Sequence, residues 1–188
     1  MNYFTVIGSR GIRATDIADF IKAAQSIHNT GKALFRSGHA MGCDYLAEIA
    51  LALNGASFDE KHEIYLPHEG FNRGDPNLNP WHIDASQLPN YEEATTMTRE
   101  AVPFFPKLTD FARRAYIRNT YQVLGQDLRS PSQAVVCWAE WRDEQHRWVK
   151  GGTASAVNMA RLHNVPVINL IDGQPAFDVL SSILEDLK

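Results

Sequence analysis

Residues 3–10 have the sequence Tyr3-Phe4-Thr5-Val6-Ile7-Gly8-Ser9-Arg10, a β-branched and aromatic run that ends in a glycine. Such a run is typical of a buried β-strand. In an open α/β sheet, ligands bind at the carboxyl ends of the strands. There a glycine lets a ligand approach the backbone, Ser9 offers a hydroxyl and an amide, and Arg10 can bind a phosphate through two hydrogen bonds. A plain strand-to-helix turn is the alternative, because the dinucleotide fingerprint Gly-x-Gly-x-x-Gly is missing.

Strands and helices alternate along the rest of the chain. Further strands are expected at 33–36, 63–67, 134–138 and 165–170, and helices at 16–28, 43–53, 92–102, 110–124, 153–163 and 176–187. This alternation predicts a parallel sheet with crossover helices. We therefore expect one domain over residues 1–188. Its predicted fold is a Rossmann-like α/β three-layer sandwich, with a mainly parallel five-stranded sheet and helices on both faces.

Residues 68–106 interrupt the alternation. The segment begins with many Asn, Pro, Asp and Gly residues and is too long for a routine connection. It is therefore expected to be a lid or a partner-binding insertion. Five residues at the end of the third strand are expected to form the rim or gate of a ligand pocket: Tyr65, His68, Phe71, Asn72 and Arg73.

Charge and cysteine content exclude several classes of protein. The formal net charge is −4, whereas a module that binds duplex DNA usually has a basic excess. The two cysteines, Cys43 and Cys137, suggest neither a disulfide framework nor a zinc motif. The first apolar run is too short for a signal peptide or a membrane span. We therefore expect a cytoplasmic protein without a membrane partner.

Two further glycine turns precede helices. Ser37-Gly38-His39-Ala40-Met41-Gly42-Cys43-Asp44 follows the second strand, and Lys150-Gly151-Gly152-Thr153 opens the helix at 153–163. Helix N-termini supply amides and a positive dipole end that suit an anion, and Thr153 can cap its helix or bind the ligand directly. Asp44 is expected to order its turn. His39 and Cys43 could share a metal ion, but no third ligand is evident nearby, so no metal is predicted.

The order of these motifs resembles a known superfamily. The segments Ile7-Gly8-Ser9-Arg10, Ser37-Gly38-x-Ala40-x-Gly42-x-Asp44, Arg118-Asn119 and Gly151-Gly152-Thr153 are similar to those of the Rossmann-like SLOG superfamily. The similarity is greatest to the branch of the bacterial DNA-processing protein A (DprA-like), and more distant to the Lonely Guy phosphoribohydrolases. It covers most of the chain apart from 68–106. The resemblance implies that the first and fourth strands are neighbours and that Arg118 and Asn119 reach into a cleft between the glycine turns.

The motifs together define a predicted phosphate cleft. Its candidate residues are Gly8, Ser9, Arg10, Ser37, Gly38, Arg118, Asn119, Gly151, Gly152 and Thr153. Three tryptophans bracket the loop before Gly151, and an aromatic face beside a phosphate site can stack on a base. Trp138 is expected in the core, while Trp141 or Trp148 is expected to contact the ligand or a partner, with His68 at the rim.

The helix that follows the third glycine turn lacks an expected catalytic group. Lonely Guy enzymes carry a glutamate just inside this helix, but Thr153 is followed here by Ala154-Ser155-Ala156-Val157. No carboxylate therefore stands where a general acid or base is needed, and no catalytic residue or cofactor is predicted. One of Glu140, Asp143 and Glu144, in the loop after the fourth strand, could substitute, although charged loop residues are usually solvated. We expect binding rather than catalysis.

Three functions stay open at this point. The favoured one is binding of a nucleotide or nucleotide-derived small molecule, for example an ADP-ribose-type signal, by a sensor or sequestering protein, as in other members of the superfamily. The second is a DprA-like recombination mediator that binds single-stranded DNA, which fits the motifs best but fits the net charge poorly. The third is a nucleotide N-glycosidic hydrolase with a relocated carboxylate. Because oligomers are common in the superfamily, a homo-oligomer is also expected.

Overall fold

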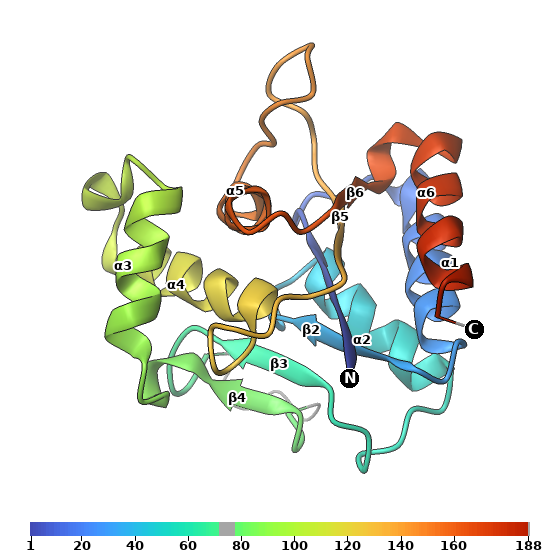
Figure 1. The fold of residues 1–188 in the computed structure, drawn as a ribbon, viewed down its shortest axis with the longest axis horizontal. Helices are drawn as coiled ribbons and strands as arrows, with labels where there is room; N and C mark the ends of the chain where they lie inside the picture. Colours follow the sequence, from blue (N-terminus) through green and yellow to red (C-terminus); the bar gives the residue numbers. More distant parts are fainter. Residues whose placement is uncertain (72–77, 188) are drawn as a thin grey trace.

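A parallel sheet lies at the centre of the molecule (Figure 1). The computed structural model describes residues 1–71 and 78–187. Within these residues the strands are β1 (Asn2–Gly8), β2 (Ala33–Ser37), β3 (Glu63–Leu66), β4 (His82–Asp84), β5 (Ala134–Trp138) and β6 (Val167–Asn169). They form one six-stranded sheet in the order β4-β3-β2-β1-β5-β6, and every neighbouring pair is parallel.

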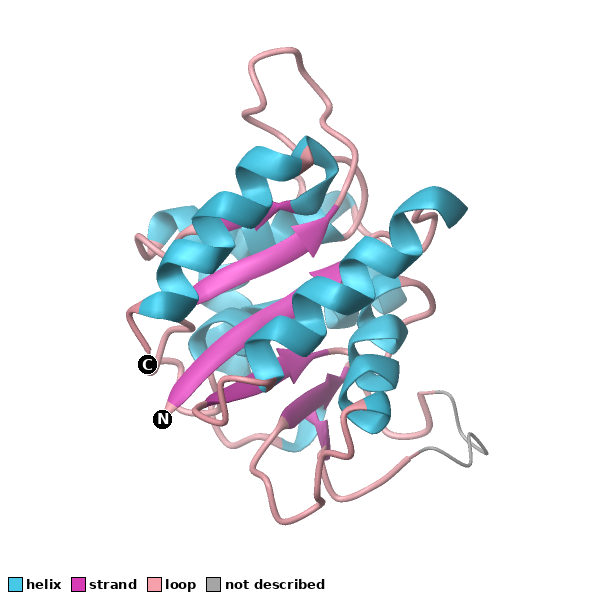
Figure 2. Cartoon of the chain, turned by 90° about the vertical axis from the view of Figure 1, so that its right-hand side faces the viewer, coloured by secondary structure: helices cyan, strands magenta, loops and turns pink. Residues whose placement is uncertain are grey.

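Helices cover both faces of the sheet, as Figures 1 and 2 show. One layer contains α1 (Ile17–His28), α2 (Cys43–Leu53) and α6 (Gln174–Glu185), and the other contains α3 (Tyr91–Ala101), α4 (Asp110–Leu124) and α5 (Thr153–Leu162). Short 3-10 turns are η1 (Ala14–Asp16), η2 (Ala85–Gln87), η3 (Phe105–Lys107) and η4 (Leu170–Asp172). The predicted α/β architecture with helices on both faces is confirmed.

The central strands are buried on both of their faces. In β5, Val136 and Trp138 pack in the core beneath α1, α2 and α6, while Val135 and Cys137 pack beneath α3, α4 and α5. A strand buried on both faces has a continuous apolar sequence, which is why the segment 134–138 was recognisable. β5 pairs with β1 from Phe4↔Ala134 to Gly8↔Trp138, so the first and fourth predicted strands are neighbours.

The prediction of five strands was wrong, because the segment 68–106 supplies a sixth. Residues His82–Asp84 form the edge strand β4 on β3, with the register Ile64↔His82. Three half-buried residues are too few to give a recognisable alternation of apolar and polar side chains. Helix α3, from the same segment, packs against α4 and α5. The predicted rim residues Asn72 and Arg73 lie outside the described residues.

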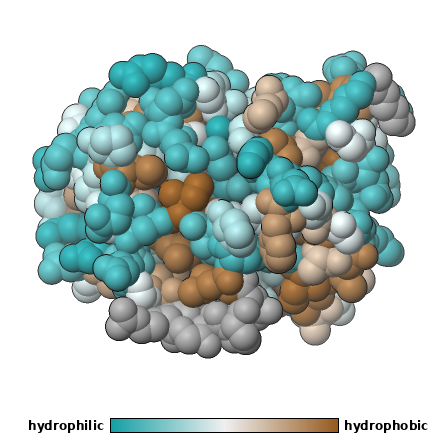
Figure 3. Space-filling view, turned by 90° about the horizontal axis from the view of Figure 1, so that it is seen from below, coloured by the Kyte–Doolittle hydropathy of each residue, from teal (hydrophilic) through white to brown (hydrophobic). Residues whose placement is uncertain are grey.

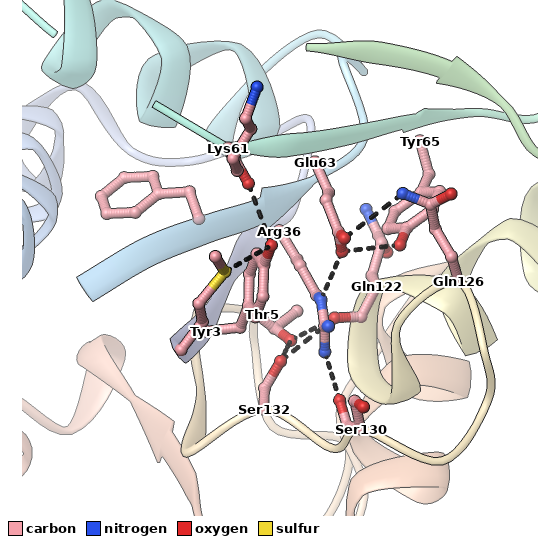
Figure 4. Close-up of polar contacts among 12 residues, drawn as sticks. Tyr3, Thr5, Arg36, Lys61, Glu63, Tyr65, Gln122, Gln126, Ser130 and Ser132 are labelled. Atoms are coloured by element: carbon pink, nitrogen blue, oxygen red, sulfur yellow. Dashed lines mark hydrogen bonds and ion pairs between the residues drawn. The ribbon is translucent and has the colours of Figure 1, made fainter. Parts of the chain in front are cut away.

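A buried arginine, Arg36 of β2, joins three strands of the sheet (Figure 4). Arg36, which is 2% exposed, donates from Nε to Glu63 Oε2 at 2.7 Å and from Nη1 to the Ser130 carbonyl at 2.6 Å. Its guanidinium also lies 4.0 Å from the centre of the Tyr3 ring. Because a buried charge must be paired, this network links β1, β2 and β3 to the loop that precedes β5.

A second buried polar group, His62, connects β2 to the loop before β3. Its Nδ1 accepts a hydrogen bond from the Phe35 N–H at 2.9 Å, and its Nε2 lies 3.0 Å from Glu60 Oε2. Burial lowers the pKa of His62 from 6.5 to about 4, although Glu60 opposes this shift. The imidazole is therefore neutral in the folded protein at neutral pH.

We expect the stability of the protein to fall between pH 6.5 and pH 4 because of His62. Over this range the unfolded chain takes up a proton that the folded chain excludes, while above pH 6.5 neither state binds it. The loss is about 1.4 kcal/mol per pH unit and approaches ~3 kcal/mol in total. Urea unfolding at pH 7, 6 and 5 measures this loss of stability.

Two variants test whether His62 causes it. His62→Asn keeps an acceptor for the Phe35 N–H but does not titrate, so it should flatten the dependence of stability on pH. The control His163→Asn, at an exposed site, should leave that dependence unchanged. A profile unchanged in His62→Asn would contradict this assignment.

The outer surface is that of an ordinary water-exposed protein on the face seen in Figure 3. Hydrophilic side chains cover most of this face, and hydrophobic ones show through in separate patches. Most folded proteins expose some apolar area in this way. No helix in the described part of the chain is long and apolar enough to cross a membrane.

Candidate functional site at the carboxyl edge of the sheet

Several helices begin at the edge where the parallel strands end. α2 follows β2 and α5 follows β5, so their N-termini lie at the carboxyl ends of those strands. α4 leads into β5, so it runs antiparallel to the strands, and its first turns also lie at the carboxyl edge of the sheet. Each N-terminus carries a partial positive charge, and ligands bind at this edge in open α/β sheets. The predicted site residues lie in these loops and first turns.

Asp44 connects the first two glycine turns to α4. Its Oδ1 accepts a hydrogen bond from the Gly8 N–H at 3.1 Å, and its Oδ2 pairs with Nη1 of Arg118 at 3.1 Å. Both side chains are buried. Burial raises the pKa of Asp44, and the Arg118 guanidinium and the Gly8 N–H oppose this rise. The Asp44 side chain therefore ties the start of α2 to the end of β1 and holds Arg118 in place; the expectation that it orders its own turn stays a prediction.

The first two glycines make room for the protein itself. A Cβ on Gly8 would lie 2.5 Å from the Trp138 carbonyl oxygen and 2.7 Å from Sγ of Cys43. A Cβ on Gly38 would lie 1.0 Å from Nη1 of Arg118. The sequence analysis expects the glycine at position 8 to let a ligand approach, and this stays a prediction. The structure adds a second reason for both glycines, because segments distant in the sequence pack closely against them.

The third glycine turn is open. Within the described residues no atom lies within 4 Å of a Cβ placed on Gly151, which has φ +74°, and Tyr116 alone approaches a Cβ on Gly152, at 3.7 Å. Gly152 is the N-cap residue of α5, and no side chain caps this helix. Thr153 is therefore the first helical residue and not the cap, and it is buried. The Ala154 and Ser155 amides donate to the Gly151 and Gly152 carbonyls, so within the described residues the amides of Gly152 and Thr153 are the ones left to bind an anion.

Asn119 holds the third turn against α4. Its Nδ2 donates to the Gly152 carbonyl at 3.0 Å and to Oγ of Ser155 at 2.7 Å. Arg118 thus contacts the second turn and Asn119 contacts the third. Their first contacts are with protein groups, so they position these turns.

Three polar candidates remain: Ser37 and Ser9, whose hydroxyl groups make hydrogen bonds within the protein, and Arg10, which is exposed. Ser37 donates its hydroxyl hydrogen bond to the Val6 carbonyl at 2.7 Å, and Ser9 Oγ accepts from the Gly11 N–H at 3.0 Å. Arg10 is exposed, and no ion pair holds it within the described residues. Of these three side chains, Arg10 is the one that can meet a ligand without breaking an existing contact.

Two buried side chains beside Gly38 keep polar atoms without partners among the described residues. They are Nε of Arg118 and both side-chain atoms of Gln122. A buried unpaired polar group costs about 1–3 kcal/mol, and such groups mark places where a ligand can bind. Gln122 was missed by the sequence analysis. Its position was a usable signal, because Gln122 comes four residues after Arg118 and residues four apart lie on one face of a helix.

The loop of residues 139–152 projects beyond β5 at the top of Figures 1 and 2. Trp141 stacks on His146 with ring centres 4.8 Å apart and donates to Asp172 at 2.6 Å, which fixes the base of the loop. Arg161 of α5 donates a hydrogen bond to the Arg147 carbonyl. Trp148 remains 50% exposed. Of the two tryptophans proposed for ligand contact, Trp148 is therefore the more accessible.

Two of the carboxylates considered as substitute catalytic groups are already paired in this loop. Glu140 lies 2.9 Å from Nζ of Lys150, and Asp143 lies 2.8 Å from Nε of Arg147. The hydrogen bond from Lys150 lowers the pKa of Glu140, which keeps it ionised. A general acid needs a raised pKa, so Glu140 is poorly suited to protonate a leaving group.

A group of aromatic side chains lies where α4 begins. The rings of His68 and Phe71 each lie 6.2 Å from the ring of Phe111, and Phe104 lies 6.3 Å from Tyr116. Phe111 is 54% exposed and Phe104 is 45% exposed. Phe104, Phe111 and Tyr116 were not predicted from the sequence, because an isolated apolar residue on a polar helix turn has no periodic signal.

Comparison with known proteins gives one structural relationship. No family model matches the sequence, and a search of curated proteins finds no match. Among solved structures, the chain is similar to DNA processing protein A from Helicobacter pylori, whose description concerns its single-stranded DNA binding mode. The TM-score is 0.54 at 15% sequence identity, over 98% of this chain and 81% of that chain. The protein therefore has a DprA-like fold.

Proposed function

We propose that this protein binds single-stranded DNA across the carboxyl edge of its sheet. The observation that carries the proposal is the open, uncapped start of α5 at Gly151 and Gly152, next to a projecting loop with a half-exposed tryptophan. Backbone amides for a phosphate and an aromatic face for a base are the two elements that single-strand-binding sites combine. The DprA-like fold supports the same assignment, since the similar protein is described as binding single-stranded DNA.

The phosphate contacts in this proposal come from amides and unpaired arginines. Arg10 follows β1, Arg142 lies in the projecting loop, and Arg114 lies in the exposed first half of α4. Within the described residues none of the three is held in an ion pair. They supply unpaired positive groups at this edge although the formal net charge of the chain is −4. Two acidic residues of the projecting loop, Glu140 and Asp143, are already paired with Lys150 and Arg147.

The base contacts come from exposed aromatic rings. Trp148 is expected to stack on one base, and Phe111 on another further along the strand. Stacking tolerates any base because every base has a π face, so little sequence preference is expected. Duplex DNA, whose bases are already stacked, cannot use these rings.

The proposal is tested by fluorescence anisotropy with a labelled oligothymidylate at two salt concentrations. We expect binding whose affinity falls with salt with a slope of about −2 in log–log form, since three phosphates are neutralised at about −0.7 each. Replacing Arg114 and Arg142 together by Gln should reduce the slope to about −0.7. Equal affinity for duplex and single strand, or no binding at low salt, would refute the proposal.

Trp148→Ala should weaken binding of the oligothymidylate about 5- to 150-fold, because one stacked base contributes about 1–3 kcal/mol. The melting temperature should change little, since the ring is half exposed. Leu53→Ala is the matched control, because Leu53 is also exposed but ends α2 at the opposite edge. The same titration measures both variants, and equal affinities in the two would count against stacking on Trp148.

A nucleotide-sized ligand is the second candidate, and one observation favours it. Nε of Arg118 and the side-chain amide of Gln122 are buried beside Gly38 without partners among the described residues, so a ligand that entered there would find polar groups to bind. A nucleotide at 100 times its dissociation constant would stabilise the fold by about 2.7 kcal/mol, which a thermal melt detects. Gln122→Leu should abolish that stabilisation and leave oligothymidylate binding unchanged, so the two functions are separable.

A further inference from the structure

Two clusters of imidazole and carboxylate groups lie inside the described part of the chain. One contains His28, Glu60 and His62, and the other contains His39, Glu48 and His82. Their composition is the same, two histidines around one glutamate. Their hydrogen bonds differ, and this difference decides which of them can bind a metal ion.

The first cluster is a closed hydrogen-bond network. Nδ1 of His62 accepts from the Phe35 N–H, so the proton of the neutral ring is on Nε2, which faces Glu60 at 3.0 Å. Nδ1 of His28 faces the donating amide of Asn54 at 3.3 Å, so its proton is also on Nε2, 2.9 Å from the same carboxylate. Both nitrogens that face Glu60 are donors and offer no lone pair to a metal.

The second cluster has the geometry of a metal site. Nδ1 of His39 lies 2.9 Å from Glu48 Oε1, Nε2 of His82 lies 3.1 Å from Glu48 Oε2, and the two nitrogens are 3.2 Å apart. Tetrahedral ligands with bonds of 2.0–2.1 Å are separated by about 3.3 Å, so shifts of a few tenths of an ångström accommodate an ion. His39 and His82 are almost completely buried, which keeps the ligands in place.

The ring of His82 can also change its proton position. Its Nδ1 lies 3.0 Å from the Asn79 N–H and 3.2 Å from both the carbonyl and the side-chain oxygen of Asn79. When Nε2 binds a metal, the proton moves to Nδ1 and is donated to one of these oxygens. A hydrogen bond from the second ring nitrogen to a carbonyl is the usual support for a metal-bound histidine. At His62 the group that faces Nδ1 is the Phe35 N–H, which is a donor and cannot accept this hydrogen bond.

We propose that His39, Glu48 and His82 bind a divalent transition-metal ion, with Zn²⁺ the expected occupant. Two imidazoles and one carboxylate suit zinc better than magnesium or calcium, which prefer oxygen ligands alone. Three protein ligands leave a fourth position for water or another group. Cys43, considered with His39 from the sequence, does not take part, because its Sγ faces the Trp138 carbonyl at 3.9 Å.

The ion would join three separate parts of the fold. His39 comes from the loop after β2, where it has φ +55°, Glu48 comes from α2, and His82 begins the short edge strand β4. Asp44 lies one turn before Glu48 on α2, and the charge of Glu48 acts on it. The bound ion would therefore fasten β4 to α2 and set the position of the loop that contains Gly38. This role does not depend on the proposed DNA binding.

The test uses the full chain, first freed of metal with a chelator and then titrated with Co²⁺. Cobalt in a four-coordinate site of nitrogen and oxygen ligands absorbs visible light much more strongly than the hydrated, six-coordinate ion, because a tetrahedral site has no inversion centre. We expect one Co²⁺ per chain, displacement by Zn²⁺, and a higher melting temperature in the loaded protein. Absence of stoichiometric binding in the wild-type protein would overturn the proposal.

Variants locate the bound ion. His82→Ala and Glu48→Gln should each weaken Co²⁺ binding at least tenfold, since even loss of an outer partner costs about 10- to 100-fold. Glu48→Gln keeps the shape of the side chain, so circular dichroism can verify that the fold is intact. His28→Ala in the first cluster is the matched control and should bind Co²⁺ as the wild type does. Binding that survives both variants, or that is lost in His28→Ala alone, would contradict the assignment.

Discussion

Asp44→Ala is expected to lower the free energy of unfolding by about 3–5 kcal/mol, because it leaves a buried guanidinium without its partner. Arg118 is 6% exposed, and its Nη1 pairs with Asp44 and packs where a side chain on Gly38 would be. The same substitution removes the acceptor of the Gly8 N–H. Urea unfolding at pH 7 measures the effect, and the variant should also lose ligand binding because the first two turns and α4 separate.

A double substitution distinguishes loss of the pair from general damage. Asp44→Ala combined with Arg118→Met removes both charges, so no unpaired charge stays buried. We expect the double variant to be more stable than Asp44→Ala alone, which a double-mutant cycle records as a coupling energy of about 0.5–3 kcal/mol. If the two single effects simply add, or if Asp44→Ala costs less than about 1 kcal/mol, the pair does not organise this edge.

Gly152→Asp should weaken oligothymidylate binding at least tenfold while leaving the protein folded. Gly152 is the N-cap of α5 with φ −65°, and only Tyr116 lies within 4 Å of the added Cβ. The backbone of Gly152 has helical angles, which aspartate also adopts without strain. Its carboxylate, however, would occupy the amides proposed for phosphate and repel it. A loss of affinity of at least tenfold, about 1.4 kcal/mol, is expected in the anisotropy titration.

Asn29→Asp is the matched control for this substitution. Asn29 is exposed and follows α1, so it lies at the opposite edge of the sheet, and aspartate keeps the oxygen that accepts from the Asn54 amide. It introduces the same charge far from the proposed site. Equal losses in the two variants would mean that net charge, and not the α5 terminus, controls binding. A destabilised Gly152→Asp protein would mean that the turn is less open than its contacts indicate.

Long elements with a regular pattern were predictable from the sequence. Helices α2 and α4 begin and end where predicted, because their length allows the 3.6-residue period to repeat several times. Strand β4 was missed, since it has only three residues at the edge of the sheet. Because β4 was missed, the sequence analysis expected five strands where the structure has six.

The site was predictable only in its outline. The motifs placed Gly8, Gly38, Arg118 and Gly152 at one edge, and their contacts join them there. Which glycines face the protein and which face solvent depends on segments far apart in the chain, so no local motif could separate them. The cluster of His39 and His82 was hidden for the same reason, because strand pairing and the path of α2 bring its members together.

Photo-crosslinking of an iodouracil-containing oligonucleotide tests the central claim most directly, because it reports both binding and its location. Iodouracil couples efficiently to aromatic side chains that stack on it. The proposed site predicts crosslinked peptides from the projecting loop, through Trp148, and from the first turns of α4, through Phe111 or Tyr116. No crosslink, or crosslinks confined to the amino edge around Tyr3, would contradict it.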